Sequence, residues 1–165
     1  MSAPAAVVTT YLEIDDPAKL RPSARPVPPG VRIDRVQPPD GATSAWFYRE
    51  VGRRHRWTDH AARTDAEWQA WAEQVETWVL TLQRRRVGYA ELRPDGDVEL
   101  AYFGLLPAHQ GQGLGAHLLG HALARGLELG PRVWLHTCTL DGPHALANYV
   151  ARGLRPYRRT TEQRR

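Results

Sequence analysis

The hexapeptide Gln-Gly-Gln-Gly-Leu-Gly at residues 110–115 constrains the fold of this chain more than any other feature. It separates an apolar run at residues 102–107 from a helical pattern that begins at Leu114. Closely spaced glycines allow a tight backbone turn, and the free N–H groups at a helix start carry the positive end of its dipole. The segment therefore predicts a loop, between a strand and a helix, that binds a phosphate or a pyrophosphate.

Two common nucleotide-binding loops do not fit this segment. A P-loop ends in Gly-Lys followed by Ser or Thr, and no lysine follows these glycines. The dinucleotide fingerprint Gly-x-Gly-x-x-Gly is also unmet, because Gly111, Gly113 and Gly115 are spaced by two and the next glycine is Gly120. What remains is the pattern Gln-x-x-Gly-x-Gly after a strand, with a turn kept only for packing as the alternative.

Length and composition indicate one globular domain. The 165 residues are 42% apolar, which suits a single domain with a sizeable core. No apolar run approaches the ~20 residues of a membrane span, and the N-terminus lacks the basic and apolar regions of a secretory signal. The single cysteine, Cys138, cannot form an internal disulfide, which fits a reducing cytosol. We expect a cytoplasmic protein without a membrane partner.

Basic residues give the chain a net charge of +4, and Lys19 is the only lysine among the 22 of them. Several arginines gather in the C-terminal tail, from Arg152 onward. A basic tail binds nucleic acid in some proteins. A solvated chain end is the commoner outcome, so we favour no role in nucleic-acid binding.

The first 30 residues differ from the rest in pattern. A β-like piece at residues 9–14 precedes a segment rich in proline at residues 22–29, where regular structure is forbidden. We interpret residues 1–30 as a Pro-rich N-terminal arm and residues 31–165 as a single folded domain.

The domain alternates between strand and helix patterns. Three successive strands with short connections predict an antiparallel meander, and a strand, a helix and a further strand around the glycine loop predict a parallel pair. These elements indicate an α/β (α+β) fold whose mixed, mostly antiparallel sheet is flanked by helices. We expect strand 31–36, helices at 44–54 and from the capping box Thr64–Glu67, strands 77–82, 87–92 and 98–103, helix 114–129, strand 133–138, and a helix from Pro143 to Gly153.

This order, with the glycine loop after the fourth principal strand, is similar to that of the GNAT acetyltransferases over about residues 31–159. The pattern Gln-x-x-Gly-x-Gly resembles the family's pyrophosphate-binding signature. Tyr149 lies four residues before Gly153, as in the last helix of many members. Glu99 lies eleven residues before Gln110, where the family's histone acetyltransferases carry a glutamate base.

Two positions depart from the family pattern. The asparagine that often begins the tyrosine-bearing helix is Gly142 here, beside Asp141, so a cofactor contact of that side chain lacks a counterpart. The last strand meets Pro156 and a short basic tail, so we expect the sheet to be truncated at that edge.

The resemblance implies that the chain transfers an acetyl group from acetyl-CoA to a primary amine by direct attack. Backbone N–H groups near Leu105 and Leu106 would bind the pantetheine arm or polarise the thioester carbonyl. A CoA-binding module without turnover is one alternative, and a nucleic-acid-associated protein acting through the arginine tail is another. The cofactor's pyrophosphate would be bound by Gln110, Gly111, Gln112, Gly113, Leu114 and Gly115.

Two residues are candidates for proton transfer. An amine with a lysine-like pKa near ~10 is protonated at neutral pH, so a base must remove a proton before attack. We assign this role to Glu99, directly or through water, with Glu91 in reserve; the alternative is that Glu99 faces solvent or pairs with an arginine. The resemblance assigns Tyr149 as the acid that protonates the CoA thiolate, and packing against the cofactor is its alternative.

Aromatic residues gather where the acceptor cleft of this fold lies. Residues 46–71 hold four of the six tryptophans. Most of these rings would pack the helices onto the sheet, whereas one or two could bind an ammonium through cation–π contacts. Our candidates for binding the acceptor are Trp46, Tyr48, Arg49, Trp57, Asp59 and His60.

Two further pairs have a simpler interpretation. Cys138 and His136 share one face of a strand, but no third group orients them as nucleophile and base, so a buried cysteine is favoured. His117 and His121 are spaced i, i+4, but further ligands cannot be assigned, so a solvated helix face is favoured and we predict no metal site. An exposed sheet edge would allow a homodimer.

Overall fold

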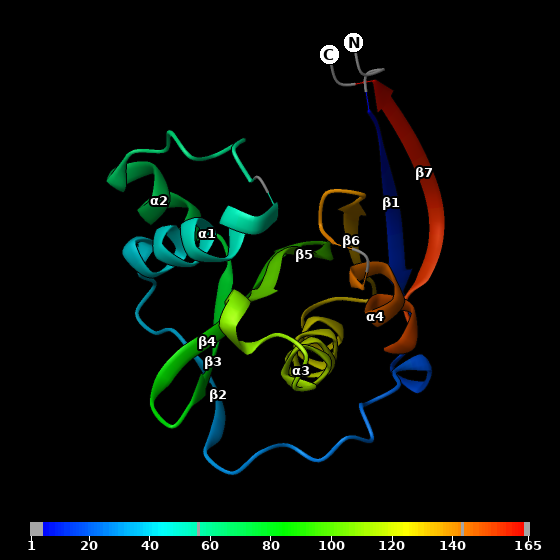
Figure 1. Cartoon of the computed structure of the whole chain (residues 1–165), viewed down its shortest axis with the longest axis horizontal. Coiled ribbons are helices and arrows are strands. Elements are labelled where there is room, and N and C mark those ends of the chain that lie inside the picture. Colours follow the sequence, from blue (N-terminus) through cyan, green and yellow to red (C-terminus); the bar gives the residue numbers. More distant parts are fainter. Residues whose placement is uncertain (1–4, 56, 143, 164–165) are drawn as a thin grey trace.

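The computed structural model describes residues 5–55, 57–142 and 144–163. Within these ranges, seven strands form one sheet in the order β2-β3-β4-β5-β6-β1-β7 (Figure 1). No helix within them is both long and apolar enough to cross a membrane. The elements are β1 (Ala6–Ile14), η1 (Pro17–Lys19), β2 (Val31–Arg35), α1 (Gly41–His55), α2 (Asp65–Ala72), β3 (Glu76–Leu82), β4 (Arg85–Asp95), β5 (Asp97–Leu105), η2 (Pro107–His109), α3 (Leu114–Leu129), β6 (Val133–Cys138), α4 (Ala145–Ala151) and β7 (Arg155–Gln163).

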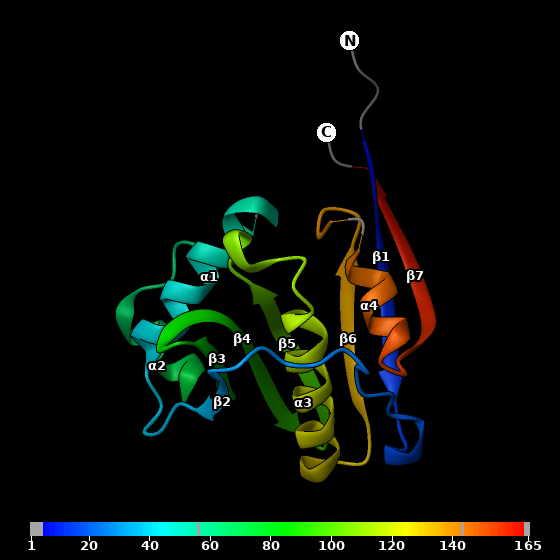
Figure 2. The ribbon, with the colours of Figure 1, turned by 60° about the horizontal axis from the view of Figure 1, so that its bottom comes forward.

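The strands β2 to β5 form the predicted antiparallel meander. Helices α1 and α2 pack on one face, through clusters centred on Phe47 and Trp68. The capping box at the start of α2 is confirmed, because the N–H of Glu67 donates to Thr64 Oγ1 at 3.2 Å. Helix α3 covers the opposite face (Figure 2) and buries an apolar stripe in the main core: Leu114, Leu118, Leu119, Ala122 and Leu123.

The strands β5 and β6 run in parallel, as the strand–helix–strand order predicted. They pair at only two positions, Val98 with Val133 and Glu99 with Trp134. Beyond these pairs the two strands diverge toward their C-terminal ends (Figure 2). Backbone groups along the two facing edges therefore no longer bond each other, and buried groups of this kind need other partners.

The strand β1 lies inside the sheet, antiparallel to both β6 and β7. Its side chains Leu12 and Ile14 are buried in the main core. The domain boundary expected at residue 31 therefore differs from the structure, in which residues 6–14 supply an inner strand. The alternating pattern indicated a strand, but its partners are distant in sequence, and local patterns do not show such pairing.

The last strand is longer than expected. β7 pairs with β1 from Arg155 opposite Glu13 to Gln163 opposite Ala6, so the expectation of a truncated edge was wrong. Pro156 is compatible with this strand because β7 is at the sheet edge, where an N–H can be missing. Much of the arginine tail thus belongs to a strand.

A buried carboxylate fastens both N-terminal helices to the meander. Glu91 on β4 has no exposed surface. Its Oε2 accepts from Ser44 Oγ at 2.6 Å and Thr77 Oγ1 at 2.7 Å, and its Oε1 accepts from Trp71 Nε1 at 3.0 Å. Burial raises the pKa of Glu91, while these hydrogen bonds oppose the rise. With both oxygens engaged inside the protein, Glu91 does not fit its reserve role as a base.

We predict that Glu91→Ala lowers the free energy of unfolding by about 3 kcal/mol, because two buried donors and one part-buried donor lose their acceptor. Urea denaturation at pH 7 measures this loss. Glu162→Ala on the exposed strand β7 is the matched control and should leave stability nearly unchanged. An equal effect of the two substitutions would show that the Glu91 contacts do not stabilise the fold.

Candidate functional site

The glycine loop and the start of α3 form a concave backbone surface, the cradle, which comprises residues 110–115. Gly111 and Gly113 have φ values of +83° and +79°, which residues with side chains rarely adopt. A Cβ on Gly111 would meet nothing within 4 Å, so the loop is open there. His117 N makes a helical bond to Gly113 O, and the N–H groups before it lack helical acceptors. This arrangement can bind an anion.

The cradle lies beside the diverging strands. A Cβ on Gly115 would be 3.5 Å from Leu105 Cδ1 on β5 and 3.9 Å from Asn148 Nδ2 on α4. The start of α3 is thus packed closely between these two elements. An anion at the cradle would therefore lie next to the edges of β5 and β6 that no longer pair.

The edge of β5 offers backbone donors at two positions. The N–H of Leu106 donates to Val87 O at 2.7 Å, so it is not free for a ligand, which corrects the expectation for Leu106. Successive N–H groups of an antiparallel strand point to opposite edges. The N–H groups of Leu105 and Phe103 are therefore directed away from β4, toward the edge that diverges from β6.

Tyr149 on α4 lies across from the same edge. Its ring centroid is 6.1 Å from that of Phe103, and the residue is 9% exposed. Burial raises the pKa of Tyr149, and the negative charge of Asp141 raises it further. The phenol therefore keeps its proton at neutral pH, as a general acid must.

Glu99 lies where β5 and β6 still pair, at the point from which the two strands diverge. It is opposite Arg93 on β4 and Trp134 on β6. Its neighbours Val98 and Leu100 are buried in the core beneath α3, so Glu99 faces the side of α1 and α2. The carboxylate is half-buried, and no ion pair with Arg93 forms within the described part of the chain.

A hydrogen bond joins the two sides of the divergence. Trp57, which follows α1, donates from Nε1 to Asp141 Oδ1 at 3.4 Å. Asp141 Oδ2 accepts from the N–H of Cys138 and from Thr137 Oγ1, each at 2.8 Å. Asp141 thus fixes the end of β6 and ties it to the connection between α1 and α2. In the sequence it stood out only as the neighbour of Gly142.

Tyr102 is the centre of an aromatic cluster beside this bridge. The ring centroids of Tyr48, Trp57 and Trp71 lie 5.6, 5.7 and 5.5 Å from that of Tyr102, and His60 lies at 6.4 Å. The structure thus brings three predicted acceptor residues together around a tyrosine that the sequence patterns did not single out. Tyr102 lies opposite Glu91 in the meander, and this pairing of the two strands is the signal that could have indicated Tyr102.

Arg63 adds a positive charge to the aromatic cluster. Its Cζ lies 4.8 Å from the ring centroid of Trp68 and 5.0 Å from that of Trp71. Its Nη1 is buried and has no partner among the described residues. Burial and then the charge of Arg63 lower the pKa of His60. The cation–π contacts expected for a substrate ammonium are thus made by the chain's own guanidinium.

Three other predicted acceptor residues lie apart from Tyr102 or at the surface. Trp46 packs edge-to-face on Phe47 at 4.9 Å and lies 5.3 Å from the Cζ of Arg86. Arg49 and Asp59 are exposed. Of the six residues, the structure brings Tyr48, Trp57 and His60 together around Tyr102.

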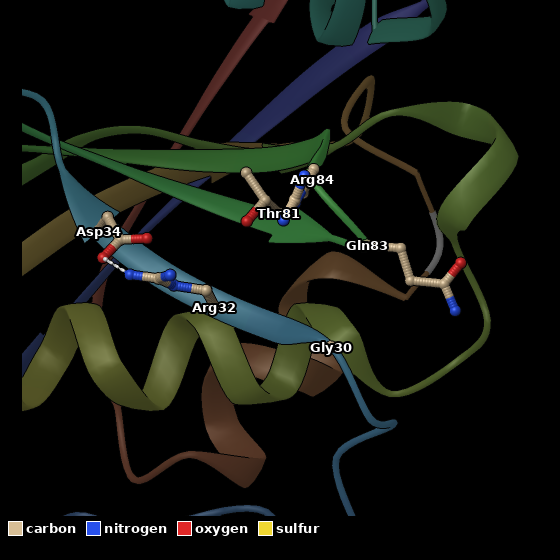
Figure 3. A pocket seen from close by; sticks show the side chains of 6 residues that line it. All are labelled: Gly30, Arg32, Asp34, Thr81, Gln83 and Arg84. Atoms are coloured by element: carbon tan, nitrogen blue, oxygen red, sulfur yellow. Dashed lines mark hydrogen bonds and ion pairs between the residues drawn. The ribbon is translucent and has the colours of Figure 1, made fainter.

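The other residues considered in the sequence lie away from the cradle and the aromatic cluster, or have simpler contacts. His121 packs on Trp78 with ring centroids 4.7 Å apart, and no metal-binding group of three or more His, Cys, Asp or Glu residues occurs among the described ones. A hollow of about 510 Å³ at the β2 edge contains the 3.4 Å pair between Arg32 and Asp34 (Figure 3). Its lining residues belong neither to the cradle nor to the aromatic cluster.

The chain matches one protein-family model. The model describes the acetyltransferase (GNAT) family and aligns with residues 43–154, which include the cradle, Glu99 and Tyr149. No curated protein sequence matches the chain.

Solved structures share the fold at low identity. A GCN5-related N-acetyltransferase from Kribbella flavida is 23% identical with a TM-score of 0.62, and the match covers 94% of this chain and 55% of that one. One from Sphaerobacter thermophilus is 15% identical with a TM-score of 0.69, covering 97% and 51%. A tandem GNAT protein from the clavulanic acid biosynthesis pathway is 19% identical with a TM-score of 0.61, covering 98% and 53%. The chain spans about half the length of these proteins.

Proposed function

The chain belongs to the acetyltransferase (GNAT) family, and on this premise we propose that it transfers an acetyl group from acetyl-CoA to a primary amine. The observation that carries the proposal is the open glycine cradle beside the diverging edges of β5 and β6. A backbone anion site and an unpaired strand edge are the two features that a long ligand with a pyrophosphate requires.

The residues at this place fit acetyl-CoA. The positive φ values of Gly111 and Gly113 and the open space at Gly111 support pyrophosphate binding by backbone N–H groups. The N–H groups of Leu105 and Phe103 would bind the pantetheine arm. Acetyl-CoA supplies the thioester whose carbonyl carbon an amine attacks.

Two side chains would move the protons. Glu99 would accept a proton from the acceptor ammonium, directly or through water, because it is half-buried on the face that carries the aromatic cluster. Tyr149 would donate a proton to the departing thiolate, because it lies beside Phe103 at the edge of β5 and a tyrosine is protonated at neutral pH.

The acceptor would bind beside Tyr102, Trp57 and His60. These residues support the choice because they adjoin the bridge from Trp57 to Asp141, which crosses the divergence. The lowered pKa of His60 favours a neutral imidazole, which can accept a hydrogen bond from an amine.

We expect Tyr149→Phe and Glu99→Gln each to lower kcat about 100-fold, since each removes a proton-transfer group. Release of free CoA, followed across a panel of amines with acetyl-CoA, measures kcat. The affinity for CoA, measured by calorimetry, should change little in both variants.

The rival function is a CoA-binding module without turnover. It would be established if the unmodified protein bound acetyl-CoA and acylated no small amine, peptide N-terminus or lysine. An unchanged kcat in Tyr149→Phe would be compatible with acyltransferase activity and would exclude Tyr149 as its general acid.

A matched pair of substitutions tests the cradle. Asp and Asn adopt positive φ more readily than other residues with side chains, and Gly111 has open space for either. We expect Gly111→Asp to bind CoA about tenfold more weakly than Gly111→Asn, because only the aspartate repels the pyrophosphate. Equal affinities of the two variants, measured by calorimetry, would contradict phosphate binding at the cradle.

A further inference from the structure

The segment between η1 and β2 crosses the N-terminal end of α3 (Figure 2). We name residues 20–30 the strap. A Cβ built on Gly113 would lie 2.6 Å from Cδ and 3.1 Å from Nε of Arg25. The side chain of Arg25 therefore rests directly on a glycine of the cradle.

Each end of the strap is anchored by a backbone hydrogen bond. At one end the N–H of Arg21 donates to Arg152 O, after α4, at 3.0 Å. At the other end the N–H of Gln83, in the β3–β4 turn, donates to Gly30 O at 3.0 Å. One anchor is at the end of α4, which connects β6 to β7, and the other is in the turn between β3 and β4, so the strap connects the two sides of the divergence across α3.

Proline content gives the strap a defined course. Pro22, Pro26, Pro28 and Pro29 each fix φ and favour extended polyproline geometry. The chain bends at Arg25 and turns at residues 29–30, where Gly30 has a φ of +82°, so the strap is extended on either side of Arg25. A segment of this kind loses little conformational entropy when it is ordered. The two anchors therefore determine where Arg25 lies.

Arg25 is available to an anionic ligand. It is exposed, and none of the ion pairs between described residues includes it. Its guanidinium presents several N–H donors in a plane, a geometry that binds phosphate oxygens in pairs. It lies beside backbone N–H groups that already favour an anion. A guanidinium beside an anion site gains an oppositely charged partner when the anion binds.

We propose that Arg25 is a phosphate ligand of the CoA site and that the strap presents it to a phosphate group of the cofactor in the cradle. The inference rests on the proposed function, because that function supplies the phosphate. It assigns to the N-terminal arm a role in binding the acyl donor.

Calorimetry with CoA and with pantetheine, which lacks the phosphates, tests the proposal. Arg25→Gln should weaken CoA binding about tenfold, the effect of losing one charge-assisted hydrogen bond at an exposed position. Binding of pantetheine should be the same in the variant and in the unmodified protein. Arg159→Gln on the exposed strand β7 removes the same charge away from the cradle and should leave both affinities unchanged.

Two measurements separate the failures. The same unfolding midpoint in both variants shows that the substitution has not altered the fold, and Arg25→Lys, which keeps the charge, should retain part of the affinity. If the unmodified protein binds CoA and Arg25→Gln binds it equally or more tightly, the role of Arg25 is overturned while the proposed function stands. If the unmodified protein binds CoA no better than pantetheine, the proposed function fails, and this inference with it.

Discussion

The parallel pairing of β5 with β6 stops after two residue pairs, and the arrangement of the candidate site depends on where it stops. On one side, the N–H groups of Phe103 and Leu105 are left without a neighbouring strand. At the open end, Gly111 and Gly113 adopt the left-handed region just before α3, whose first N–H groups lack helical acceptors. On the far side, α4 brings Tyr149 to Phe103. A single break in the ladder thus brings together the backbone groups and the tyrosine on which the proposed function depends.

Such a break weakens the sheet, and the N-terminal 30 residues compensate for it. β1 flanks β6 and carries β7, and Glu13 bonds Arg132 Nε and Arg155 Nη2, each at 2.6 Å, so that one carboxylate links the three strands. The hydrogen bonds from these arginines lower the pKa of Glu13. The strap then leads the chain back across α3 to β2. The segment that reads as an arm in the sequence therefore joins both parts of the sheet.

The elements that could be predicted from the sequence are those whose geometry is local. The glycines of the cradle impose their own backbone conformation, and Thr64 bonds a residue three positions away. The rest depends on pairing between distant segments. Nothing local shows that the N–H of Leu106 is bonded to Val87, and Glu91 draws its donors from three separate elements. The place of β1 has the same cause, because a strand's pattern shows which face is buried but not its neighbours.

The aromatic cluster shows that aromatic content alone does not determine the charge of a site. Its tryptophans indicated a surface for an ammonium, yet the faces of Trp68 and Trp71 are occupied by Arg63. The carboxylate of Glu91 has no exposed surface and accepts three hydrogen bonds inside the protein, so it does not contact a ligand at the surface. The guanidinium also disfavours protonation of His60. A charged amine near Tyr102 would therefore be repelled by Arg63. Aromatic content alone therefore does not select a cation here.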